Sequence, residues 1–385
     1  MNRTVFFHIE PWLFRQKVIV LYGARQVGKT TLSKALLEKH GRPQDYYLCE
    51  RLEVREILQT ANPERIKQFF GDAKMVILDE AQTVENIGQI LKLLHDTFPD
   101  LQIIATGSAS FDLANKLNEP LTGRALQFML YPLSLQELEP HYNRMEIKAG
   151  LAHFLVYGSY PGFLGLPLTE QRMLLNNLTE QYLYKDLLMF ESLQNSEKIH
   201  RLLKLLALQI SSEVSIHELA VQLGISRATV ERFLDVLQKM FIIVKIGSFS
   251  RNLRKELSKK AKYYFCDVGI RNSLLNHFSP LEARTDVGAL WENFCVMERI
   301  KFWHNQNERI NAYFWRTHDQ QEIDYLEEKD GALRGFEFKW QAPRRFAPPQ
   351  IFLNTYPNAK IDLISPMQLF DLIAPFGESP NSNMT

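Results

Sequence analysis

The sequence predicts an α/β protein of several domains, with a parallel sheet first, a helical region next and a second mixed region last. Three observations support this fold class. The chain has 385 residues, which exceeds the roughly 250–300 residues that one hydrophobic core supports. Short apolar runs alternate with amphipathic stretches as far as residue 135. Beyond that point apolar residues recur at helical spacing, and short apolar runs return toward the C-terminus.

The N-terminal region contains five short apolar runs that predict buried strands. Each is too short for a buried helix, and most are rich in Val, Ile, Tyr or Phe. They cover residues 17–22, 45–49, 75–79, 101–106 and 126–131. Amphipathic stretches at 31–40 and 87–96 predict helices between them. Strands that alternate with helices imply a parallel sheet with both faces covered.

The rest of the chain is predicted to be helical at first and mixed later. Apolar residues at helical spacing predict helices over 135–139, 147–157, 170–188, 196–211 and 291–302. Short apolar runs predict strands over 312–315, 322–327, 333–340 and 360–365. We therefore expect a sheet domain at 1–135, a helical region at 136–211, a compact unit at 212–250, a mixed α/β domain at 251–377 and a polar, disordered tail at 378–385.

Composition excludes several classes of protein. Lys and Arg number 45 and Asp and Glu 44, so the net charge is +1, and any nucleic-acid contact must use a local basic patch. The three cysteines, Cys49, Cys266 and Cys295, are too few and too scattered for a disulfide framework or a structural zinc site. No apolar run approaches the ~18–20 residues of a membrane span, and no signal peptide is evident. We expect a cytoplasmic protein that does not associate with membranes.

Residues 23–30 fit the pattern G-x-x-x-x-G-K-[ST], between a predicted strand and a predicted helix. Such a loop points successive backbone N–H groups at phosphate oxygens, and the helix N-terminus adds partial positive charge. Its lysine reaches the terminal phosphates, and its threonine hydroxyl can ligate Mg²⁺. The alternative is a glycine turn that happens to carry a Lys-Thr pair, and the flanking elements argue against it. The residues expected to bind nucleotide are Gly23, Ala24, Arg25, Gln26, Val27, Gly28, Lys29, Thr30 and Thr31.

Two acidic residues end the predicted strand at 75–79. Asp79 lies at its carboxyl end, where ligands bind in open parallel sheets. We expect Asp79 to hold Mg²⁺ through water, together with Thr30, and Glu80 to polarise the attacking water as a general base. The alternative is a strand that ends in an acidic turn. The presence of the phosphate-binding pattern makes that alternative the weaker one.

Two further features lie where a hydrolase would use them. Thr106 ends the strand predicted at 101–106 and Ser108 follows it, where a hydroxyl group can orient water against the terminal phosphate. Simple turn chemistry explains Gly and Ser there equally well. Arg124 precedes the strand at 126–131 and cannot easily reach its own phosphates, but it can reach those of a neighbouring subunit as an arginine finger. The alternative is a surface arginine at a helix end.

In this order, these segments resemble the core of an AAA-type ATPase. The set of 23–30, Leu-Asp-Glu-Ala-Gln at 78–82, Thr-Gly-Ser at 106–108 and Leu-Thr-Gly-Arg at 121–124 is similar to a widespread prokaryotic subgroup that carries a C-terminal domain of unknown function. Further matches occur at 132–134, 158–161, 184–186, 262–269 and 291–294. The resemblance implies that ATP is bound with Mg²⁺ and hydrolysed. It implies a sensor residue at Thr106 or Ser108 and an arginine finger at Arg124, with a helical lid at 136–211. It implies no single biological role.

The compact unit at 212–250 predicts a helix-turn-helix. A helix begins after the Ser215 cap, a turn follows at 223–226, and a second helix begins after the Ser226 cap. Residues 241–246 then predict a wing strand. The side chains near the start of the second helix, where base or phosphate contacts arise, are Arg227, Thr229 and Arg232.

A basic cluster follows the predicted wing strand. Glu256 is the one acidic residue within it. Phosphate contacts would release counterions and so favour binding. Winged-helix modules also bind proteins, and basic runs are often solvated faces, but we favour contact with nucleic acid, most simply DNA. The cluster comprises Arg251, Arg254, Lys255, Lys259, Lys260 and Lys262.

The C-terminal region predicts a cluster of carboxylates and a lysine. The strands at 322–327 and 333–340 are joined by the turn at 329–331, and alternation places Glu337 and Lys339 on one face, with Asp324 opposite. Two acids can hold Mg²⁺ against a phosphodiester, the lysine can orient water, and Glu292 on a preceding helix can add a contact. This order resembles the PD-(D/E)xK nuclease-like fold of restriction endonucleases. The alternative is a hairpin whose outer face alternates charged and aromatic residues.

The sequence therefore predicts an ATPase that couples hydrolysis to DNA binding or remodelling. The expected assembly is a homo-oligomer in which Arg124 acts in trans on a neighbouring subunit. The alternative is a nucleotide-gated regulatory switch whose C-terminal domain only docks a partner. The two hypotheses differ in whether nucleic acid stimulates ATP turnover.

Overall fold

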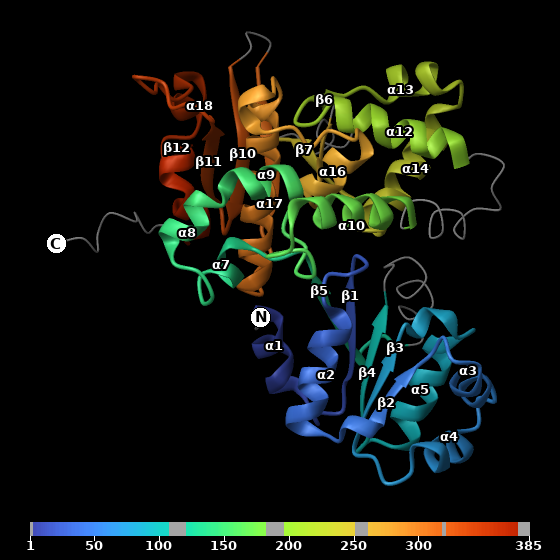
Figure 1. Cartoon of the computed structure of the whole chain (residues 1–385). Helices are drawn as coiled ribbons and strands as arrows, with labels where there is room; N and C mark the ends of the chain where they lie inside the picture. The colour runs from blue at the N-terminus through green and yellow to red at the C-terminus, as the bar shows by residue number, and fades with distance from the viewer. Residues whose placement is uncertain (1–2, 108–120, 182–195, 251–260, 318–320, 376–385) are drawn as a thin grey trace. The chain divides into compact units, whose positions relative to one another are not determined.

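The chain folds into two compact units in the computed structural model (Figure 1). The N-terminal unit comprises residues 1–132 with 239–242, and the C-terminal unit comprises residues 133–238 and 243–385. The structure describes residues 3–107, 121–181, 196–250, 261–317 and 321–375. Within these ranges no helix is both long enough and apolar enough to cross a membrane.

The N-terminal unit is built on a five-stranded parallel sheet, as predicted. Its strand order is β2-β3-β4-β1-β5. Every residue of β1, β3 and β4 is buried, whereas the edge strands β2 and β5 are mostly half-buried. A central strand of a parallel sheet is covered on both faces, which explains its uninterrupted apolar run. The strands are β1 (Val18–Gly23), β2 (Tyr46–Leu48), β3 (Met75–Asp79), β4 (Gln102–Gly107) and β5 (Ala125–Leu130).

Helices join these strands. Those predicted at 31–40 and 87–96 are present, and α2 begins two residues earlier, at Lys29. Two short helices between β2 and β3 were not predicted, and an Asn62 side chain that accepts from Arg65 N caps the second of them. The helices are α1 (Thr4–Ile9), α2 (Lys29–His40), α3 (Leu52–Gln59), α4 (Pro63–Phe70) and α5 (Ile87–Thr97).

The C-terminal unit contains most of the helices in the described residues. The single helix predicted at 147–157 is wrong, because Gly150 ends α8 and begins α9. The helix predicted at 170–188 is α10 as far as Gln181, and its remaining residues lie outside the described ones. The helices are α7 (Leu135–Leu138), α8 (Arg144–Ala149), α9 (Leu151–Tyr157), α10 (Leu168–Gln181), α12 (Ser196–Leu208), α13 (Ile216–Leu223), α14 (Arg227–Lys239), α16 (Val268–Leu274), α17 (Val287–Asn305) and α18 (Gln350–Thr355).

A seven-stranded mixed sheet forms the other layer of the C-terminal unit. Its order is β12-β11-β10-β9-β7-β8-β6. The strand predicted at 241–246 is β7, and β7 and β8 are antiparallel neighbours on either side of the boundary expected at residue 250. The hairpin predicted around 329–331 joins β10 to β11. The strands are β6 (Glu213–Val214), β7 (Ile243–Ser248), β8 (Ala261–Phe265), β9 (Asn311–Arg316), β10 (Glu322–Lys329), β11 (Ala332–Phe338) and β12 (Lys360–Ile364).

Buried ion pairs anchor α17 in the C-terminal unit. The Arg299 guanidinium donates two hydrogen bonds to the Glu327 carboxylate, at 2.8 and 2.7 Å, and both side chains are fully buried. Two parallel N–H···O bonds fix the geometry of such a pair and satisfy much of the desolvated charge. Since Glu327 belongs to β10, this pair holds the helix on the sheet.

A second charged group sits where α17 begins. Arg271 Nη1 and Arg284 Nε lie 2.5 and 2.9 Å from the Asp286 carboxylate oxygens. Burial alone would raise the pKa of Asp286, but hydrogen bonds from Arg284 and Arg271 outweigh burial and lower that pKa to about 2. The carboxylate therefore stays charged over the range in which the unit is expected to be folded.

Candidate functional site

The loop between β1 and α2 requires glycine at two positions. A Cβ atom on Gly23 would lie 2.3 Å from the Leu130 carbonyl oxygen, because β1 and β5 are neighbours at this level. Gly28 has a φ of +98°, a left-handed conformation that L side chains rarely adopt. The loop thus passes tightly over the strand end and enters α2 with its N–H groups at the helix N-terminus.

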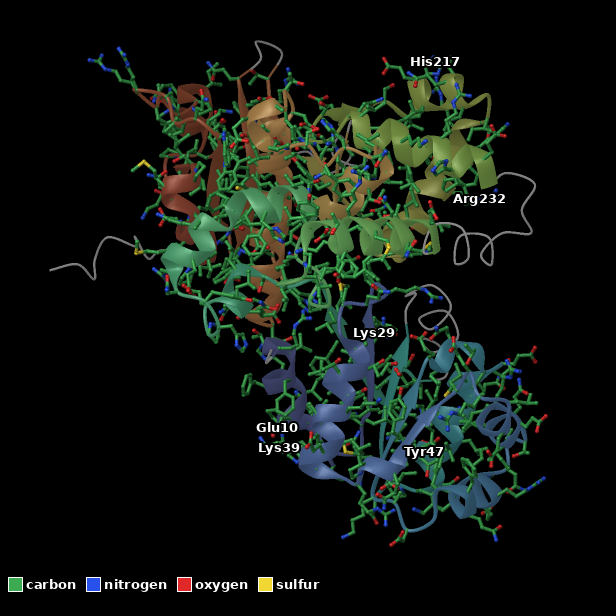
Figure 2. The ribbon with its side chains drawn as sticks, in the orientation of Figure 1. Glu10, Lys29, Lys39, Tyr47, His217 and Arg232 are labelled. Carbon is green, nitrogen blue, oxygen red and sulfur yellow. The ribbon has the colours of Figure 1, made fainter. Side chains whose placement is uncertain are left out.

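The lysine of the loop is folded back onto it. Lys29 lies at the start of α2 in the N-terminal unit (Figure 2). Its Nζ donates to the carbonyl oxygens of Gly23 and Ala24, at 3.0 and 2.8 Å. The side chain is buried, so the ammonium group is held close to the space that the loop encloses. This is the position that the sequence pattern predicts for a lysine that meets a phosphate.

Asp79 receives three hydroxyl groups at the carboxyl end of β3. Thr30 Oγ1 donates to Asp79 Oδ2 at 2.8 Å, the Tyr46 hydroxyl donates to the same oxygen, and Thr106 Oγ1 donates to Oδ1. Asp79 is 2% exposed. All three of these donors are neutral hydroxyl groups.

Tyr46 is a site residue that the sequence interpretation missed. It lies on β2 in register with Ile77, so its side chain shares a face of the sheet with Asp79. The Lys34 ammonium lies 4.5 Å from the centre of its ring. Burial, followed by the hydrogen bond to Asp79, raises the pKa of Tyr46 above its usual range, so the hydroxyl remains a donor. A tyrosine near the start of a predicted strand is too common a feature to have identified it.

Glu80 adopts a conformation that is unusual for its residue type. Its φ is +54° and its ψ is +43°, which is the left-handed region. Its backbone N donates to Thr106 Oγ1 at 3.2 Å, and Gln82 Nε2 donates to its carboxylate at 2.5 Å. The single Thr106 hydroxyl therefore contacts both acidic positions of the site.

The oxygen-rich arrangement fits a magnesium nucleotide. A hydroxyl group, a carboxylate and phosphate oxygens are the ligands that Mg²⁺ prefers in such loops. Three neutral hydroxyl groups donate to the buried Asp79 carboxylate, so a hydrated cation would add positive charge beside it. Lys29 and the N–H groups of the loop supply the donors that a phosphate needs.

Arg124 lies at the amino ends of the strands, whereas the phosphate-binding loop lies at their carboxyl ends. It immediately precedes β5, and its backbone oxygen accepts from Val18 N at the start of β1. The phosphate-binding loop follows the far end of β1. Arg124 Nε lies 2.7 Å from Asp96 Oδ1 in the same chain, and both side chains are about one-third exposed or more. Within its own chain Arg124 is therefore remote from the loop, as the sequence analysis expected.

Some predicted site residues lie outside the described residues. They are Ser108, Arg251, Arg254, Lys255, Lys259 and Lys260. The tail predicted at 378–385 and the motif at 184–186 also lie outside them. Their predicted roles stay predictions.

A second polar cluster lies in the C-terminal unit. Lys339 Nζ is 3.0 Å from Glu337 Oε2 and 3.5 Å from Asp324 Oδ2, and Asp324 also accepts from Phe338 N. Glu292, on α17, accepts from Lys262 Nζ at 2.9 Å and from the Tyr264 hydroxyl at 2.8 Å. The structure thus joins Asp324, Glu337 and Lys339 as predicted.

The charges of this cluster are coupled. Burial and the Asp324 carboxylate raise the pKa of Glu292 to about 7, and the same two causes raise the pKa of Glu337 to about 7. Burial alone would lower the pKa of Lys339, but Asp324 and Glu337 hold it above its usual range. Asp324 therefore links the two ends of the cluster electrostatically.

The cluster does not match a metal site in this arrangement. Among the residues that the structure describes, no group of three or more His, Cys, Asp or Glu side chains is placed to hold a metal ion. The ammonium groups of Lys262 and Lys339 pair with Glu292 and Glu337 instead. The lysines provide the positive charge that a bound Mg²⁺ would otherwise supply.

The α13–α14 pair carries the predicted nucleic-acid residues. Ser215 and Ser226 cap the two helices as predicted, since their side chains accept from Glu218 N and Thr229 N. Arg227 and Arg232 are exposed on α14, and Arg232 is labelled there in Figure 2, whereas Thr229 is half-buried and bonded to Ser226. Their contact with nucleic acid remains a prediction.

Comparison with protein-family models assigns three segments of the chain. Residues 15–139 match an AAA domain. Residues 148–281 and 287–363 match two domains of unknown function, DUF8612 and DUF4143. The N-terminal segment is thus similar to AAA domains, for which nucleotide binding is expected.

The chain is similar to several uncharacterized proteins. One from Mycobacterium tuberculosis is 26% identical over 331 residues, which cover 85% of this chain and 71% of that protein. One from Methanocaldococcus jannaschii is 25% identical over 340 residues, covering 83% and 74%. One from Haemophilus influenzae is 23% identical over 368 residues, covering 90% and 88%. The similarity extends along most of each chain.

A solved structure, that of Drosophila ORC bound to AT-rich DNA and Cdc6, matches with 12% sequence identity. The match covers 71% of this chain and 90% of that one. Its TM-score is 0.25, which is too low for any inference about fold or function.

Proposed function

We propose that the N-terminal unit hydrolyses ATP with Mg²⁺ and that hydrolysis controls DNA binding or remodelling by the C-terminal unit. The observation that carries the proposal is the buried Asp79 carboxylate, which three neutral hydroxyl groups hold beside the phosphate-binding loop. A simple acidic turn would expose its carboxylate to solvent rather than bury it among hydroxyl groups beside this loop.

Each residue of the site has a distinct part in this reaction. The loop N–H groups and Lys29 bind the phosphates, and Thr30 with Asp79 would hold the magnesium ion, which neutralises charge on the phosphate oxygens. Glu80 orients and deprotonates the attacking water. Its left-handed backbone supports this role, since strained conformations of this kind cluster at functional sites. Thr106 keeps both acids in position.

Arg124 completes the proposal as a residue that acts on a neighbouring subunit. Its place at the amino ends of the strands, away from the loop, supports action in trans, since from there it cannot stabilise charge on its own nucleotide. The pair with Asp96 is exposed and therefore weak enough to exchange for a phosphate. The functional form is then a homo-oligomer.

The helical part of the C-terminal unit supports a winged-helix interpretation. The chain passes through α12, β6, α13, α14, β7 and β8, and the three strands are ordered β6-β8-β7. These three strands form an antiparallel part of the seven-stranded sheet, α13 and α14 lie between β6 and β7 in the sequence, and the basic cluster begins just after β7. Exposed Arg227 and Arg232 near the start of α14 are suited to phosphate or base contacts.

The carboxylate and lysine cluster supports a nuclease-like fold more than it supports cleavage. Asp324, Glu337 and Lys339 converge from neighbouring strands, which is the pattern of that fold. This arrangement does not by itself imply cleavage, because fold and chemistry are separable. The alternative function is a nucleotide-gated switch whose C-terminal unit docks another protein.

Two measurements test the proposal. Calorimetry should show Mg²⁺-dependent binding of ATP to the wild type and to Glu80→Gln, and no binding to Lys29→Ala, while Glu80→Gln hydrolyses ATP slowly. ATP turnover is then measured with duplex, forked and junction DNA. Stimulation by DNA supports the proposal, and turnover that no nucleic acid alters supports the switch. A Mg²⁺ or Mn²⁺ cleavage assay with wild type and Lys339→Ala decides whether the C-terminal unit cuts.

A further inference from the structure

A buried arginine near the N-terminus contacts the phosphate-binding loop. Arg3, which precedes α1, is 7% exposed. Its Nη1 donates to the Val27 carbonyl oxygen at 2.6 Å, and its Nη2 donates to the Tyr131 carbonyl oxygen at 2.6 Å. The planar guanidinium group thus joins two backbone positions that are 104 residues apart in sequence.

The two carbonyl groups belong to segments with different tasks. Val27 lies within the loop, directly before Gly28 and Lys29. Tyr131 is the residue after β5, and β5 is paired with the loop's own strand up to the Gly23–Leu130 level. The Leu130 oxygen fills the space beside Gly23, so the loop and the end of β5 are already packed closely. Arg3 adds a hydrogen-bonded link between them.

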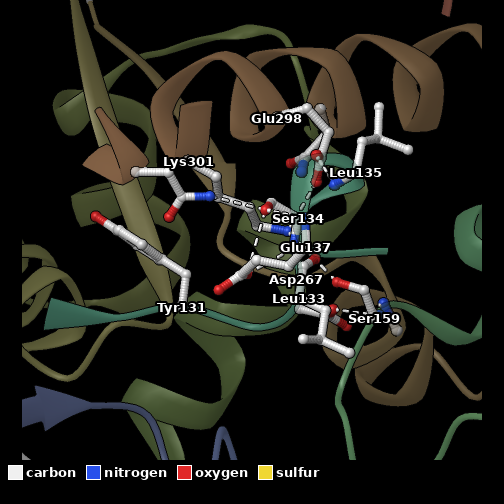
Figure 3. Close-up of polar contacts among 12 residues, drawn as sticks. Tyr131, Leu133, Ser134, Leu135, Glu137, Ser159, Asp267, Glu298 and Lys301 are labelled. Carbon is white, nitrogen blue, oxygen red and sulfur yellow. Dashed lines mark hydrogen bonds and ion pairs between the residues drawn. The ribbon is translucent and has the colours of Figure 1, made fainter. Parts of the chain in front are cut away.

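The chain continues from Tyr131 through Pro132 into the C-terminal unit, whose first residues are fixed on α17. Within that unit Lys301 Nζ donates to the Leu133 oxygen at 3.0 Å, and Leu135 N donates to Glu298 Oε2 at 2.6 Å (Figure 3). Lys301 and Glu298 are themselves a buried ion pair at 2.9 Å. Both sides of Pro132 are therefore fixed, each within its own unit.

We propose that Arg3 is a positioning residue that transmits the nucleotide state of the loop to the start of the C-terminal unit. This inference rests on the proposed function, since it needs a nucleotide at the loop. Phosphate binding draws the loop N–H groups and Lys29 toward the ligand and so shifts the Val27 carbonyl group. The two hydrogen bonds of the Arg3 guanidinium group transmit that shift to Tyr131, and the covalent chain transmits it through Pro132 to Leu133.

The test measures amide hydrogen exchange of the full chain with and without a non-hydrolysable ATP analogue and Mg²⁺. In the wild type, nucleotide should change the exchange of residues 131–138. In Arg3→Ala at saturating analogue this change should be lost, although affinity falls by no more than ~tenfold, about 1.4 kcal/mol. Arg3→Lys keeps the charge but cannot donate to both carbonyl groups in the geometry of a guanidinium, so the exchange of residues 131–138 should change only partly in this variant. Arg15→Ala, an exposed arginine on the same N-terminal segment, should match the wild type.

The outcomes separate the two proposals. A wild type that binds no nucleotide overturns the proposed function, and this inference with it. Normal binding with a wild-type exchange response in Arg3→Ala, or no response at 131–138 in the wild type, overturns the coupling alone. If Arg3→Ala fails to fold, Arg3→Lys decides: a full response in that variant also counts against the coupling.

Discussion

Replacing Thr106 with valine tests whether one hydroxyl group organises both acids of the nucleotide site. Thr106 is fully buried at the end of β4. Its Oγ1 donates to Asp79 and accepts from Glu80 N at 3.2 Å. Valine has nearly the same shape, so the substitution removes the hydroxyl group and little else. The loss then falls on two identified hydrogen bonds.

The magnitude follows from these two bonds. A hydrogen bond to a charged group contributes ~1.5–3 kcal/mol, and a backbone N–H left unpaired in a buried site costs ~1–3 kcal/mol. The free energy of unfolding of the N-terminal unit should fall by about 3–5 kcal/mol, which corresponds to roughly 10 °C or more in melting temperature for a unit of this size. Scanning calorimetry measures this fall in melting temperature. The transition of the N-terminal unit is identified as the one that Mg²⁺ and ATP shift.

Catalysis should respond more strongly than binding. The substitution leaves in place the hydrogen bonds from Lys29 Nζ to the Gly23 and Ala24 carbonyl oxygens, so ATP affinity should stay within ~threefold. The kcat should fall by ~10–100-fold, part of the ~10²–10⁴ that a general base contributes. Thr106→Ser, which restores the hydroxyl group, should recover most of both losses. A valine variant with wild-type kcat and a melting temperature within a few degrees of wild type would show that Thr106 does not hold these acids.

The remaining predictions concern the oligomer, the nucleic-acid contact and pH. Mixing Arg124→Ala with Lys29→Ala should restore part of the ATP turnover that each lacks alone, whereas a rate per subunit independent of protein concentration argues against action in trans. Arg227→Ala should weaken DNA binding and make log Kd less dependent on log salt by about one phosphate contact, and an unchanged salt slope would remove Arg227 from the interface. Because the pKa of Asp286 is depressed in the folded state, its contribution to stability is present above pH ~4 and is lost as pH falls toward 2. In acid-unfolding curves the stability of Asp286→Asn should therefore fall less steeply with pH over this range than that of the wild type.

The sequence predicts the N-terminal sheet well because burial and pattern coincide there. The strands β1, β3 and β4 are covered on both faces, so each is an uninterrupted apolar run with its chemistry at one end. Parallel strands bring their carboxyl ends to one edge, which is why Asp79 and Thr106 were expected beside the loop and are found there.

The C-terminal unit is less predictable because its elements depend on distant partners. The two-residue strand β6 exists only through its pairing with β8, and no local pattern marks it. The expected boundary at 250 follows a change in composition, but β7 and β8 pair across it. Lys262 was read as part of an exposed basic cluster, yet it is buried against Glu292. Tertiary structure determines both the burial of its aliphatic stem and its ion pair.

The contacts of Asp79 show why a motif alone is an incomplete description of the site. Its three donors, Thr30, Tyr46 and Thr106, come from α2, β2 and β4, and only the first and last stand at positions that a pattern marks. Tyr46 is in register with Ile77, two residues before Asp79, a distance of ~6–7 Å along the strand. A phenol ring leaning along the strand spans that distance, but sequence spacing does not report the direction in which a side chain leans. The loop pattern predicts where phosphate binds. The convergence of three hydroxyl groups on one buried carboxylate is the observation on which the proposed cation site rests, and the pattern alone does not contain it.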